Sequence, residues 1–357
     1  MLLLDNIVFE LQKAGGVSLV WRAILDACIA DTELNCHAID SGAGFKNIFY
    51  PENMNGVKLI KERGPLALRR YLTINKNISA TVFHSSYFRV HSNKKVKNIV
   101  TVHDFVYEKF DSGLRKHVHL LQKKHALKAA DVIICVSQNT KEDLLSYHPA
   151  LGEKEIRVIY NGVSTDFCPH KEGADALSNR NNAPYLLYVG GRFAHKNFNA
   201  ALQLLLTPAA NKMGLKLKVV GGGALTDKEQ ELISHLGLLN KVSHTGHVSS
   251  KELNMLYNLA FAFIYPSLYE GFGIPPLEAM AAGCPVICSN ISSIPEVVGQ
   301  AGLLFDPTQI ESVEPYLEKL QHRDYRQQIV RNGLEHSAQF SWHKTGQQTL
   351  SLYKELL

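Results

Sequence analysis

The stretch Leu259–Gly283, LAFAFIYPSLYEGFGIPPLEAMAAG, contains the pattern that decides the fold. Its first seven residues are apolar or aromatic and predict a buried strand, which is followed by a turn rich in glycine and proline. Pro275 and Pro276 suit the first turn of a helix, because the leading N–H groups of a helix have no partner inside it. We therefore expect a strand, a turn and a helix that ends at the last glycine, with Glu270 before the turn and Glu278 in the first helical turn.

The same order of strand, loop and helix recurs along the chain. Apolar runs such as NIVTVHD, DVIICVS, IRVIYNG, PYLLYVGG and LKVVGGG end in polar residues or glycine, and most lead into a helical stretch. Near-continuous apolar strands that alternate with helices are typical of parallel sheets covered on both faces. The sequence thus predicts an α/β fold whose ligands bind beyond the carboxyl ends of the strands.

The length of 357 residues predicts two domains, because it exceeds what one ordinary core covers. The segment CPHKEGADALSNRNNAP, residues 168–184, is polar, contains glycine and two prolines, and predicts a linker. We place an N-terminal domain at residues 1–168 and a second domain at residues 169–340. The last stretch, residues 341–357, has apolar residues near helical spacing, and the predicted helix could pack on either domain.

The composition is that of a soluble globular protein, with 45% hydrophobic and 20% charged residues and no apolar run of about eighteen residues that would cross a membrane. The start, MLLLDNIVFELQ, lacks a basic lead and predicts a first strand rather than a signal peptide. The six cysteines are scattered without a C-x-x-C pair, which favours small buried side chains in a reducing cytoplasm. We therefore expect a cytoplasmic protein.

The turn after the strand predicts an anion site. Gly271 and Gly273 are flexible, and the helix that follows offers bare amides and the positive end of its dipole, to which a phosphate fits. Glu278 can then accept two hydroxyls of one ribose, while Glu270 faces whatever lies beyond the phosphates. The alternative is that both glutamates are surface acids beside a structural turn.

A second cluster lies in GGRFAHKN, residues 190–197, directly after the apolar run PYLLYV. Arg192 and Lys196 stand four residues apart, so both can point to one diphosphate, arginine as a fork and lysine as a point charge. The spacing of a P-loop is missing. A basic pair after a strand is also compatible with ordinary solvated surface.

Three weaker signals stand at other strand ends. The triple glycine at residues 221–223 suits either a ligand's approach or a tight turn, and Gly15 with Gly16 suits a close backbone approach in the first domain. His103 ends the run NIVTVH, where it serves either a ligand or the structure.

Together these motifs resemble the retaining glycosyltransferases of family 4. YEGFGIPPLE is similar to the E-x7-E element of that family, GGRFAHKN to its G-x-R…K-N segment, and NGVSTDF, residues 161–167, to its domain-end signature. The run from HTGHVSSKELNMLYNLA to SNISSIPEVVGQAGLLFDP is similar throughout, Gly15 and Gly16 correspond to the N-terminal glycine loop, and TVHD to the acceptor-side histidine. The resemblance covers nearly the whole chain.

The resemblance implies a GT-B fold: two Rossmann-like domains with parallel sheets that face across a cleft, and a C-terminal helix that crosses back to the N-terminal domain. It implies that Glu278 holds the ribose, Glu270 the donor sugar, Arg192 and Lys196 the diphosphate, and that His103 contacts the sugar. No metal or other cofactor is expected, and the chain has no D-x-D sequence. The catalytic residues implied are Glu270, His103, Arg192 and Lys196, and the donor-binding residues are Gly15, Gly16, Arg192, Lys196, Gly222, Val248, Glu270, Gly271, Phe272, Gly273, Ile274 and Glu278.

The expected activity is the transfer of a sugar from a nucleotide sugar to a saccharide or lipid-linked saccharide. TVHDFVYE resembles mannosyltransferases of surface-polysaccharide pathways, so GDP-mannose is the first donor expected and O-antigen biosynthesis the process. Two alternatives stay open: a nucleotide-sugar epimerase of the same fold and a catalytically silent nucleotide-sugar-binding partner. A dehydrogenase is disfavoured because no G-x-G-x-x-G follows the first strand.

The net charge of +5 lies wholly in the first half, since residues 1–168 hold 22 Lys+Arg against 17 Asp+Glu and the remainder 16 against 16. Residues 58–76 and residues 109–128 each hold six basic residues and one acid. We expect these segments to lie either on an anionic membrane that carries the acceptor or on ordinary solvated surface. Nucleic acid is not an expected partner, because the pI of about 8.7 is modest and no recognition motif accompanies it.

Overall fold

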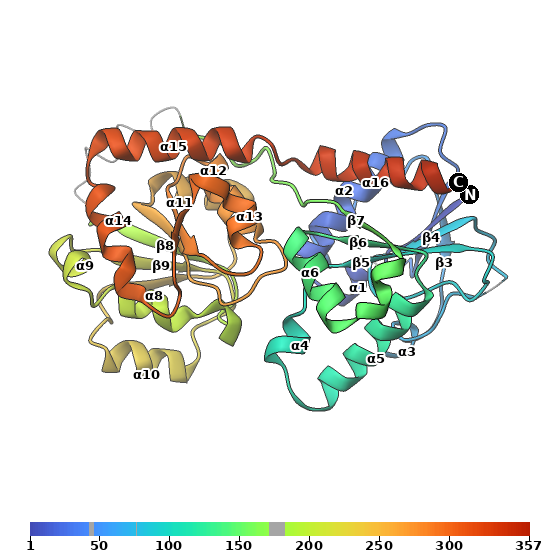
Figure 1. Ribbon diagram of the computed structural model, residues 1–357, viewed down its shortest axis with the longest axis horizontal. Coiled ribbons are helices and arrows are strands. Elements are labelled where there is room, and N and C mark those ends of the chain that lie inside the picture. Colours follow the sequence, from blue (N-terminus) through green and yellow to red (C-terminus); the bar gives the residue numbers. More distant parts are fainter. Residues whose placement is uncertain (43–45, 76, 171–182) are drawn as a thin grey trace. The chain divides into compact units, whose positions relative to one another are not determined.

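The computed structural model describes residues 1–42, 46–75, 77–170 and 183–357 (Figure 1). The chain divides into unit 1, Met1–Gly162 with Ser341–Leu357, and unit 2, Val163–Phe340. The division precedes the boundary that we predicted after residue 168, because Val163 and Phe167 pack in the apolar core of unit 2. Most of the predicted linker, residues 171–182, lies outside the described residues.

Unit 1 is built on a parallel sheet of seven strands in the order β3-β2-β1-β4-β5-β6-β7. The strands are β1 (Leu2–Asp5), β2 (Cys36–Asp40), β3 (Val57–Lys61), β4 (Val82–Ser85), β5 (Lys97–Val102), β6 (Val132–Cys135) and β7 (Glu155–Val158). The helices are α1 (Val8–Leu11), α2 (Gly16–Ala30), α3 (Leu66–Arg69), α4 (Val106–Phe110), α5 (Gly113–Ala129), α6 (Gln138–Tyr147) and α16 (Trp342–Leu356).

Unit 2 is built on a parallel sheet of six strands in the order β10-β9-β8-β11-β12-β13. The strands are β8 (Tyr185–Val189), β9 (Lys216–Val220), β10 (Val242–Thr245), β11 (Ala262–Tyr265), β12 (Val286–Ser289) and β13 (Leu303–Phe305). The helices are α8 (Phe198–Leu204), α9 (Pro208–Lys212), α10 (Asp227–His235), α11 (Ser250–Leu259), α12 (Ile274–Ala281), α13 (Ile294–Val298), α14 (Glu314–Lys319) and α15 (Arg323–Ser337).

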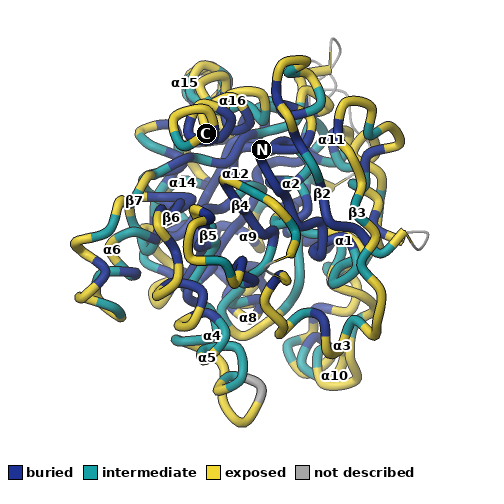
Figure 2. Tube along the Cα trace, turned by 90° about the vertical axis from the view of Figure 1, so that its right-hand side faces the viewer, coloured by how far each residue is buried: buried dark blue, intermediate teal, exposed yellow. Residues whose placement is uncertain are grey.

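Both faces of each sheet are buried, as the near-continuous apolar runs predicted. In β8, Leu186 and Tyr188 pack in one apolar cluster, whereas Tyr185 and Leu187 pack in another. Successive side chains of a strand point to opposite faces, so these two clusters lie on the two sides of the sheet. The strands form the dark interior of Figure 2. The α/β prediction is confirmed.

The C-terminal helix α16 packs on α2 and belongs to unit 1. Leu350, Leu352 and Tyr353 of α16 join the core that contains Leu2 and Leu4 of β1. Because this core already includes the first strand, the last residues of the chain complete the unit in which the chain begins. The crossing back of the C-terminal helix, which the resemblance implied, is confirmed.

Five of the six cysteines are buried and unpaired, but Cys168 is exposed. The expectation of buried cysteines is therefore wrong for Cys168, because it stands at the start of the polar segment and not in a strand or helix. Within the described residues, no helix is long and apolar enough to span a membrane.

A buried histidine makes the stability of unit 1 depend on pH. His84 of β4 lies between the Tyr353 hydroxyl at 2.6 Å from Nδ1 and the Thr101 hydroxyl at 2.9 Å from Nε2. Burial lowers the pKa of His84 to about 3, with a smaller contribution from His103.

We expect the free energy of unfolding to fall as the pH drops below about 6.5, since the unfolded chain takes up a proton that the folded chain refuses until about pH 3. Each buried histidine of this kind changes the free energy of unfolding by about 1.4 kcal/mol per pH unit in this range. Urea denaturation at pH 5 and pH 7.5 measures this dependence, and His84→Gln should show a weaker pH dependence than the wild type. An unchanged pH dependence would contradict the assignment.

Candidate functional site

The turn between β11 and α12 begins the candidate site in unit 2. The helix starts at Ile274, so Pro275 and Pro276 occupy its second and third positions and Glu278 falls in the second turn. The prediction that Glu278 lies in the first turn is therefore wrong, because the helix begins two residues before Pro276. The two prolines also lack N–H groups, which leaves Ile274 and Leu277 as the amide donors of the first four helical residues.

Two serines of the loop after β12 fix the shape of this turn. The Ser292 hydroxyl accepts the Glu270 N–H at 2.9 Å and donates to the Glu270 carbonyl, and Ser293 donates to the carbonyls of Glu270 and Phe272 at 2.9 Å each. Ser292 adopts a left-handed conformation with φ 59°. The loop after the neighbouring strand β12 thus fixes the turn between β11 and α12. Our sequence analysis assigned no role to either serine.

Lys196 and Glu270 form an ion pair at the carboxyl end of the sheet. The Lys196 Nζ donates to both carboxylate oxygens of Glu270, at 2.7 and 2.9 Å, and to the Tyr265 hydroxyl at 3.2 Å. The exposed fractions of the two side chains are 19% and 11%. Lys196 follows β8 and Glu270 follows β11, and these strands are neighbours in the sheet. The structure therefore brings together two of the predicted site residues.

Arg192 binds the glycine-rich turn after β9 and one acid. Its Nε donates to Glu229 at 2.7 Å, and its Nη atoms donate to the four carbonyls of residues 221–224 at 2.7 to 3.3 Å. Only 4% of the side chain is exposed. The structure thus shows Arg192 ordering the turn after β9, and its predicted contact with a diphosphate stays a prediction.

Gly222 has a structural reason to be glycine. Its φ is +73°, and a Cβ atom there would lie 2.7 Å from the Arg192 Nη1 and 2.8 Å from the Gly190 carbonyl oxygen. A side chain would therefore displace the arginine from the turn. Glu229, which holds Arg192, also closes the capping box of α10 with Thr226, so one acid orients both the helix start and the guanidinium.

Glu278 lies against a buried tyrosine. The Tyr257 hydroxyl donates to the Glu278 carboxylate at 3.2 Å and lies 3.4 Å from the Pro275 carbonyl. Burial raises the pKa of Glu278 to about 7, and the tyrosine hydrogen bond opposes this shift only in part. Near neutral pH the carboxyl group is therefore divided between its two protonation states, and a ligand that donates hydroxyls to it would favour the ionised one.

The remaining predicted residue of unit 2, Val248, follows β10, packs against the apolar core beneath the site and is partly exposed. In unit 1, Gly15 is the residue before α2 and Gly16 is the first residue of that helix. Val248, Gly15 and Gly16 therefore lie close to the ends of strands or helices. Their predicted contacts with the donor stay predictions.

His103 directly follows β5, as predicted, and is partly buried. Burial lowers the pKa of His103 to about 4, with Lys123 acting in the same direction and Asp104 in the other. The imidazole is thus uncharged at neutral pH, so one ring nitrogen can donate a hydrogen bond and the other can accept one.

Lys123 of α5 supports the loop that carries His103. Its side chain is 1% exposed, and its Nζ donates to the Asp104 carbonyl at 2.8 Å and to Glu108 at 2.7 Å. The same Nζ lies 3.5 Å from the centre of the Phe105 ring. We missed this buried lysine, because in the sequence it is one of five Lys/Arg residues on a polar helix.

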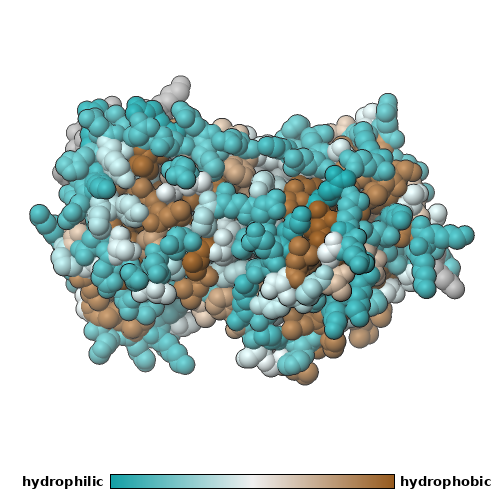
Figure 3. Space-filling model, in the orientation of Figure 1, coloured by the Kyte–Doolittle hydropathy of each residue, from teal (hydrophilic) through white to brown (hydrophobic). Residues whose placement is uncertain are grey.

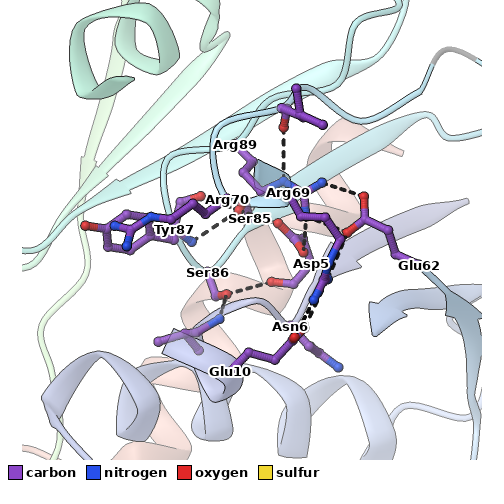
Figure 4. Close-up of polar contacts among 12 residues, drawn as sticks. Asp5, Asn6, Glu10, Glu62, Arg69, Arg70, Ser85, Ser86, Tyr87 and Arg89 are labelled. Carbon is purple, nitrogen blue, oxygen red and sulfur yellow. Dashed lines mark hydrogen bonds and ion pairs between the residues drawn. The ribbon is translucent and has the colours of Figure 1, made fainter. Parts of the chain in front are cut away.

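A buried network of arginines and acids joins the strand ends of unit 1 (Figure 4). Arg89 contacts Asp5 at 3.2 Å and Glu62 at 2.7 Å, while Arg69 contacts Glu62 at 3.2 Å and Glu10 at a short distance. The side chains of Arg89 and Asp5 are each 1% exposed. The sequence signal that we passed over is Asp5 itself, an acid at the end of the apolar run MLLLD.

Known proteins match the chain over nearly its whole length. The family model described as glycosyl transferases group 1 matches residues 171–336, and that of glycosyltransferase family 4 matches residues 49–167. The O-antigen chain mannosyltransferase B of Escherichia coli is 31% identical over 287 residues, which are 77% of this chain and 74% of that protein.

Two solved structures share the fold. Sucrose-phosphate synthase from Thermosynechococcus elongatus has a TM-score of 0.77 at 20% identity and matches 99% of this chain and 98% of that one. Anabaena Alr3699/HepE, solved in complex with UDP and glucose, has a TM-score of 0.73 at 15% identity and matches 99% of both chains. The chain therefore belongs to the family 4 glycosyltransferases and has the GT-B fold.

Proposed function

We propose that this glycosyltransferase moves mannose from GDP-mannose to a saccharide or lipid-linked saccharide acceptor, with retention of the anomeric configuration, in the synthesis of a surface polysaccharide such as O-antigen. The observation that carries the proposal is the Lys196–Glu270 pair beside the turn into α12, with Glu278 in the next helical turn. The donor choice is supported by the similarity to an O-antigen mannosyltransferase.

The proposed chemistry needs positive charge where the diphosphate leaves. Breaking the bond between the anomeric carbon and the phosphate oxygen places negative charge on the diphosphate and positive charge on the sugar. Lys196 and the N-terminus of α12 stabilise the leaving group, and Glu270 binds the sugar hydroxyls. Arg192 helps to bind the diphosphate either by ordering the turn at residues 221–224 or by contacting the diphosphate directly. We propose that no metal takes part, because these groups supply the charge and the chain lacks a D-x-D sequence.

Retention follows from attack on the face that the diphosphate leaves. The acceptor hydroxyl approaches that face, and the departing phosphate oxygen takes its proton. No nucleophilic side chain is assigned, so no covalent intermediate is proposed. The roles of His103 at the sugar, Gly15 and Gly16 near the phosphate, and the backbone near Val248 at the base stay predictions.

The test is a transfer assay with purified protein, a panel of nucleotide sugars and a mannoside acceptor, with the product's anomeric configuration read by NMR. GDP-mannose should be the preferred donor, and the first product should keep the donor's α-configuration. Formation of an epimerised nucleotide sugar without acceptor would favour the epimerase. Donor binding without turnover by any acceptor would favour the silent partner.

Donor affinity should depend on pH through Glu278. If the ionised carboxylate accepts the ribose hydroxyls, binding below about pH 7 first requires loss of the proton, so the Kd of GDP-mannose should rise by up to about tenfold per pH unit as the pH falls. Calorimetry from pH 5.5 to 8.5 measures this, and the diphosphate diester of the intact donor does not titrate there. Glu278→Gln should bind more weakly at pH 8 and show a flat profile. A flat wild-type profile would remove Glu278 from the ribose site.

We also propose that the protein works in the cytoplasm, peripherally at an anionic membrane surface. The structure reduces the positive charge that could contact such a surface, because Arg69, Lys109 and Lys123 pair with acids. The basic residues that are exposed are Lys58, Lys61, Arg63, Lys124 and Lys128. Lys76 lies outside the described residues. Each exposed basic side chain contributes about 1 kcal/mol near such a surface. Sedimentation with anionic and neutral vesicles tests the proposal, and equal binding to both would remove it.

A further inference from the structure

Two adjoining pockets of opposite character lie on unit 1 between α5 and the segment that follows α3. The first, of about 500 Å³, is lined by Arg70, Tyr71, Tyr107, Leu114, Val118 and His119. The second, of about 310 Å³, includes Leu72, Phe88, Leu121 and Gln122 in its lining. Tyr71 and Val118 line both pockets, so the two form one continuous depression with a mixed and an apolar half.

The wall of the mixed pocket is aromatic. The rings of Tyr107 and His119 stack with their centres 4.0 Å apart, and the Tyr87 hydroxyl lies 3.2 Å from the His119 Nδ1. Burial lowers the pKa of His119 to about 4, so this ring is uncharged at neutral pH. Flat aromatic surfaces of this kind pack against the C–H face of a sugar ring and leave the hydroxyls at its edge free for polar contacts.

Two polar atoms beneath this wall are buried and have no hydrogen-bond partner within the described part of the chain. They are the Nε of Arg70, a donor, and the Oε1 of Gln122, an acceptor. The Nε2 of the same glutamine donates to the carbonyls of Arg70 and Phe88, which fixes the amide between the two pockets. The residues that line the mixed pocket include Tyr71 and Tyr107, whose hydroxyl groups can donate and accept hydrogen bonds with sugar hydroxyls.

Arg70 differs from its neighbour Arg69 in what surrounds it. Arg69 is held by Glu10 and Glu62, whereas the Arg70 guanidinium lies over the Tyr87 ring at 5.5 Å (Figure 4). The same guanidinium lies 5.0 Å from the centre of the Tyr71 ring. Arg70 makes no ion pair with any described residue. The network therefore neutralises one arginine and leaves the next one charged beside the aromatic wall.

Three leucines that line the depression are largely exposed to solvent. Leu72 and Leu121 of the apolar pocket and Leu114 of the mixed pocket have exposed fractions of 58%, 69% and 79%. Hydrophobic residues are visible around the turn between α4 and α5 in Figure 3. Exposed apolar patches mark binding surfaces. Of the six Lys/Arg in residues 109–128, Lys109 and Lys123 pair with acids, whereas Lys124 and Lys128 are exposed and leave positive charge for an anionic ligand.

We propose that this depression binds the acceptor as an anionic glycolipid: a sugar ring on the aromatic wall beside Arg70, and the hydrocarbon chain on Leu72 and Leu121. The proposal deepens the proposed function by assigning the acceptor's binding site, and it rests on that function. The mixed half provides hydroxyl partners, the apolar half provides the surface for the chain, and the unpaired arginine faces the anionic linkage.

The test uses octyl α-mannoside below its micelle concentration as the probe, with binding to the full chain measured by saturation-transfer NMR. Arg70→Gln and Leu121→Ser should each weaken binding by about tenfold, the scale of one lost charge-assisted contact or one buried leucine. The control Leu239→Ser, at a leucine of unit 2 that is 63% exposed, should bind as the wild type. Fluorescence of Trp21 and Trp342, both in unit 1, confirms folding of the two pocket variants, and circular dichroism confirms folding of Leu239→Ser in unit 2.

Three results would overturn the site. One is wild-type protein that does not bind octyl mannoside, and another is unchanged binding by both variants. The third is loss of anionic-vesicle binding in Leu121→Ser with octyl mannoside binding intact, which would make the face a membrane surface only. Calorimetry with GDP-mannose separates the proposed function from the proposed acceptor site. If the wild type binds GDP-mannose and both pocket variants bind octyl mannoside normally, only the acceptor site is contradicted.

Discussion

Lys196→Ala is expected to lower the rate of sugar transfer by about 10²- to 10³-fold, by analogy with removal of one preorganised oxyanion donor. The structure gives the reason: Lys196 is the cation that lies beside both Glu270 and the turn into α12, at 2.7 Å from the carboxylate. Without it, the leaving diphosphate loses its nearest positive charge and Glu270 loses its partner. The kcat/KM for GDP-mannose measures the effect.

The control separates catalysis from folding. Lys212→Ala removes an exposed lysine of α9 in the same unit and should leave the rate unchanged. The Lys196→Ala variant should also keep its circular dichroism and unfolding midpoint close to those of the wild type. A folded variant with near-normal turnover would show that the diphosphate does not lie at Lys196.

Arg192→Ala should likewise lower the rate of transfer by about 10²- to 10³-fold while the protein stays folded. The double variant Arg192→Ala/Lys196→Ala is the stricter test of the diphosphate assignment, and near-normal turnover in the folded double variant would refute it. If Arg192 acts only through the turn at residues 221–224, the single change should also raise hydrogen exchange in that turn, because the four hydrogen bonds from the guanidinium to its carbonyls are lost.

Arg89→Met is expected to destabilise unit 1 by about 3 to 5 kcal/mol, the cost of leaving one member of a buried ion pair without its partner. Arg89 holds Asp5 in the interior and also binds Glu62 and the Leu72 carbonyl. Burial already raises the pKa of Asp5 against the influence of Arg89, so the carboxylate depends on that arginine for its charge. Urea denaturation followed by fluorescence reports unit 1, since both tryptophans belong to it.

Two variants complete this experiment. Asp5→Asn/Arg89→Met should recover part of the lost stability, because no buried charge is left unpaired. Lys97→Met, which breaks the exposed Lys97–Asp131 pair at 3.4 Å, should cost no more than about 1 kcal/mol. If Arg89→Met unfolded at the same urea concentration as Lys97→Met, the network would have no special role in stability.

Most of the strands that the sequence revealed are buried on both faces, and the exception is the edge strand β7, found through the run IRVIYNG. NIVTVHD, PYLLYVGG and AFAFIYPS became β5, β8 and β11, all inside their sheets. The edge strands β3 and β10 escaped notice because most of their residues, VKLIK and VSHT, are exposed or only partly buried. The central strands β2 and β4 were missed for another reason, since the polar residues of CHAID and VFHS interrupt the apolar run.

The sequence by itself determined the parallel α/β fold and the strand ends at which ligand-binding residues gather, because strand period and turn chemistry are local properties of the chain. Only the tertiary structure decided the partners: Lys196 with Glu270, Arg192 with Glu229, and Asp5 with Arg89. These pairs form because β8 lies between β9 and β11 and β1 lies beside β4. Strand order in a sheet depends on packing across the whole unit, so residues far apart in the chain acquire partners that no short stretch encodes.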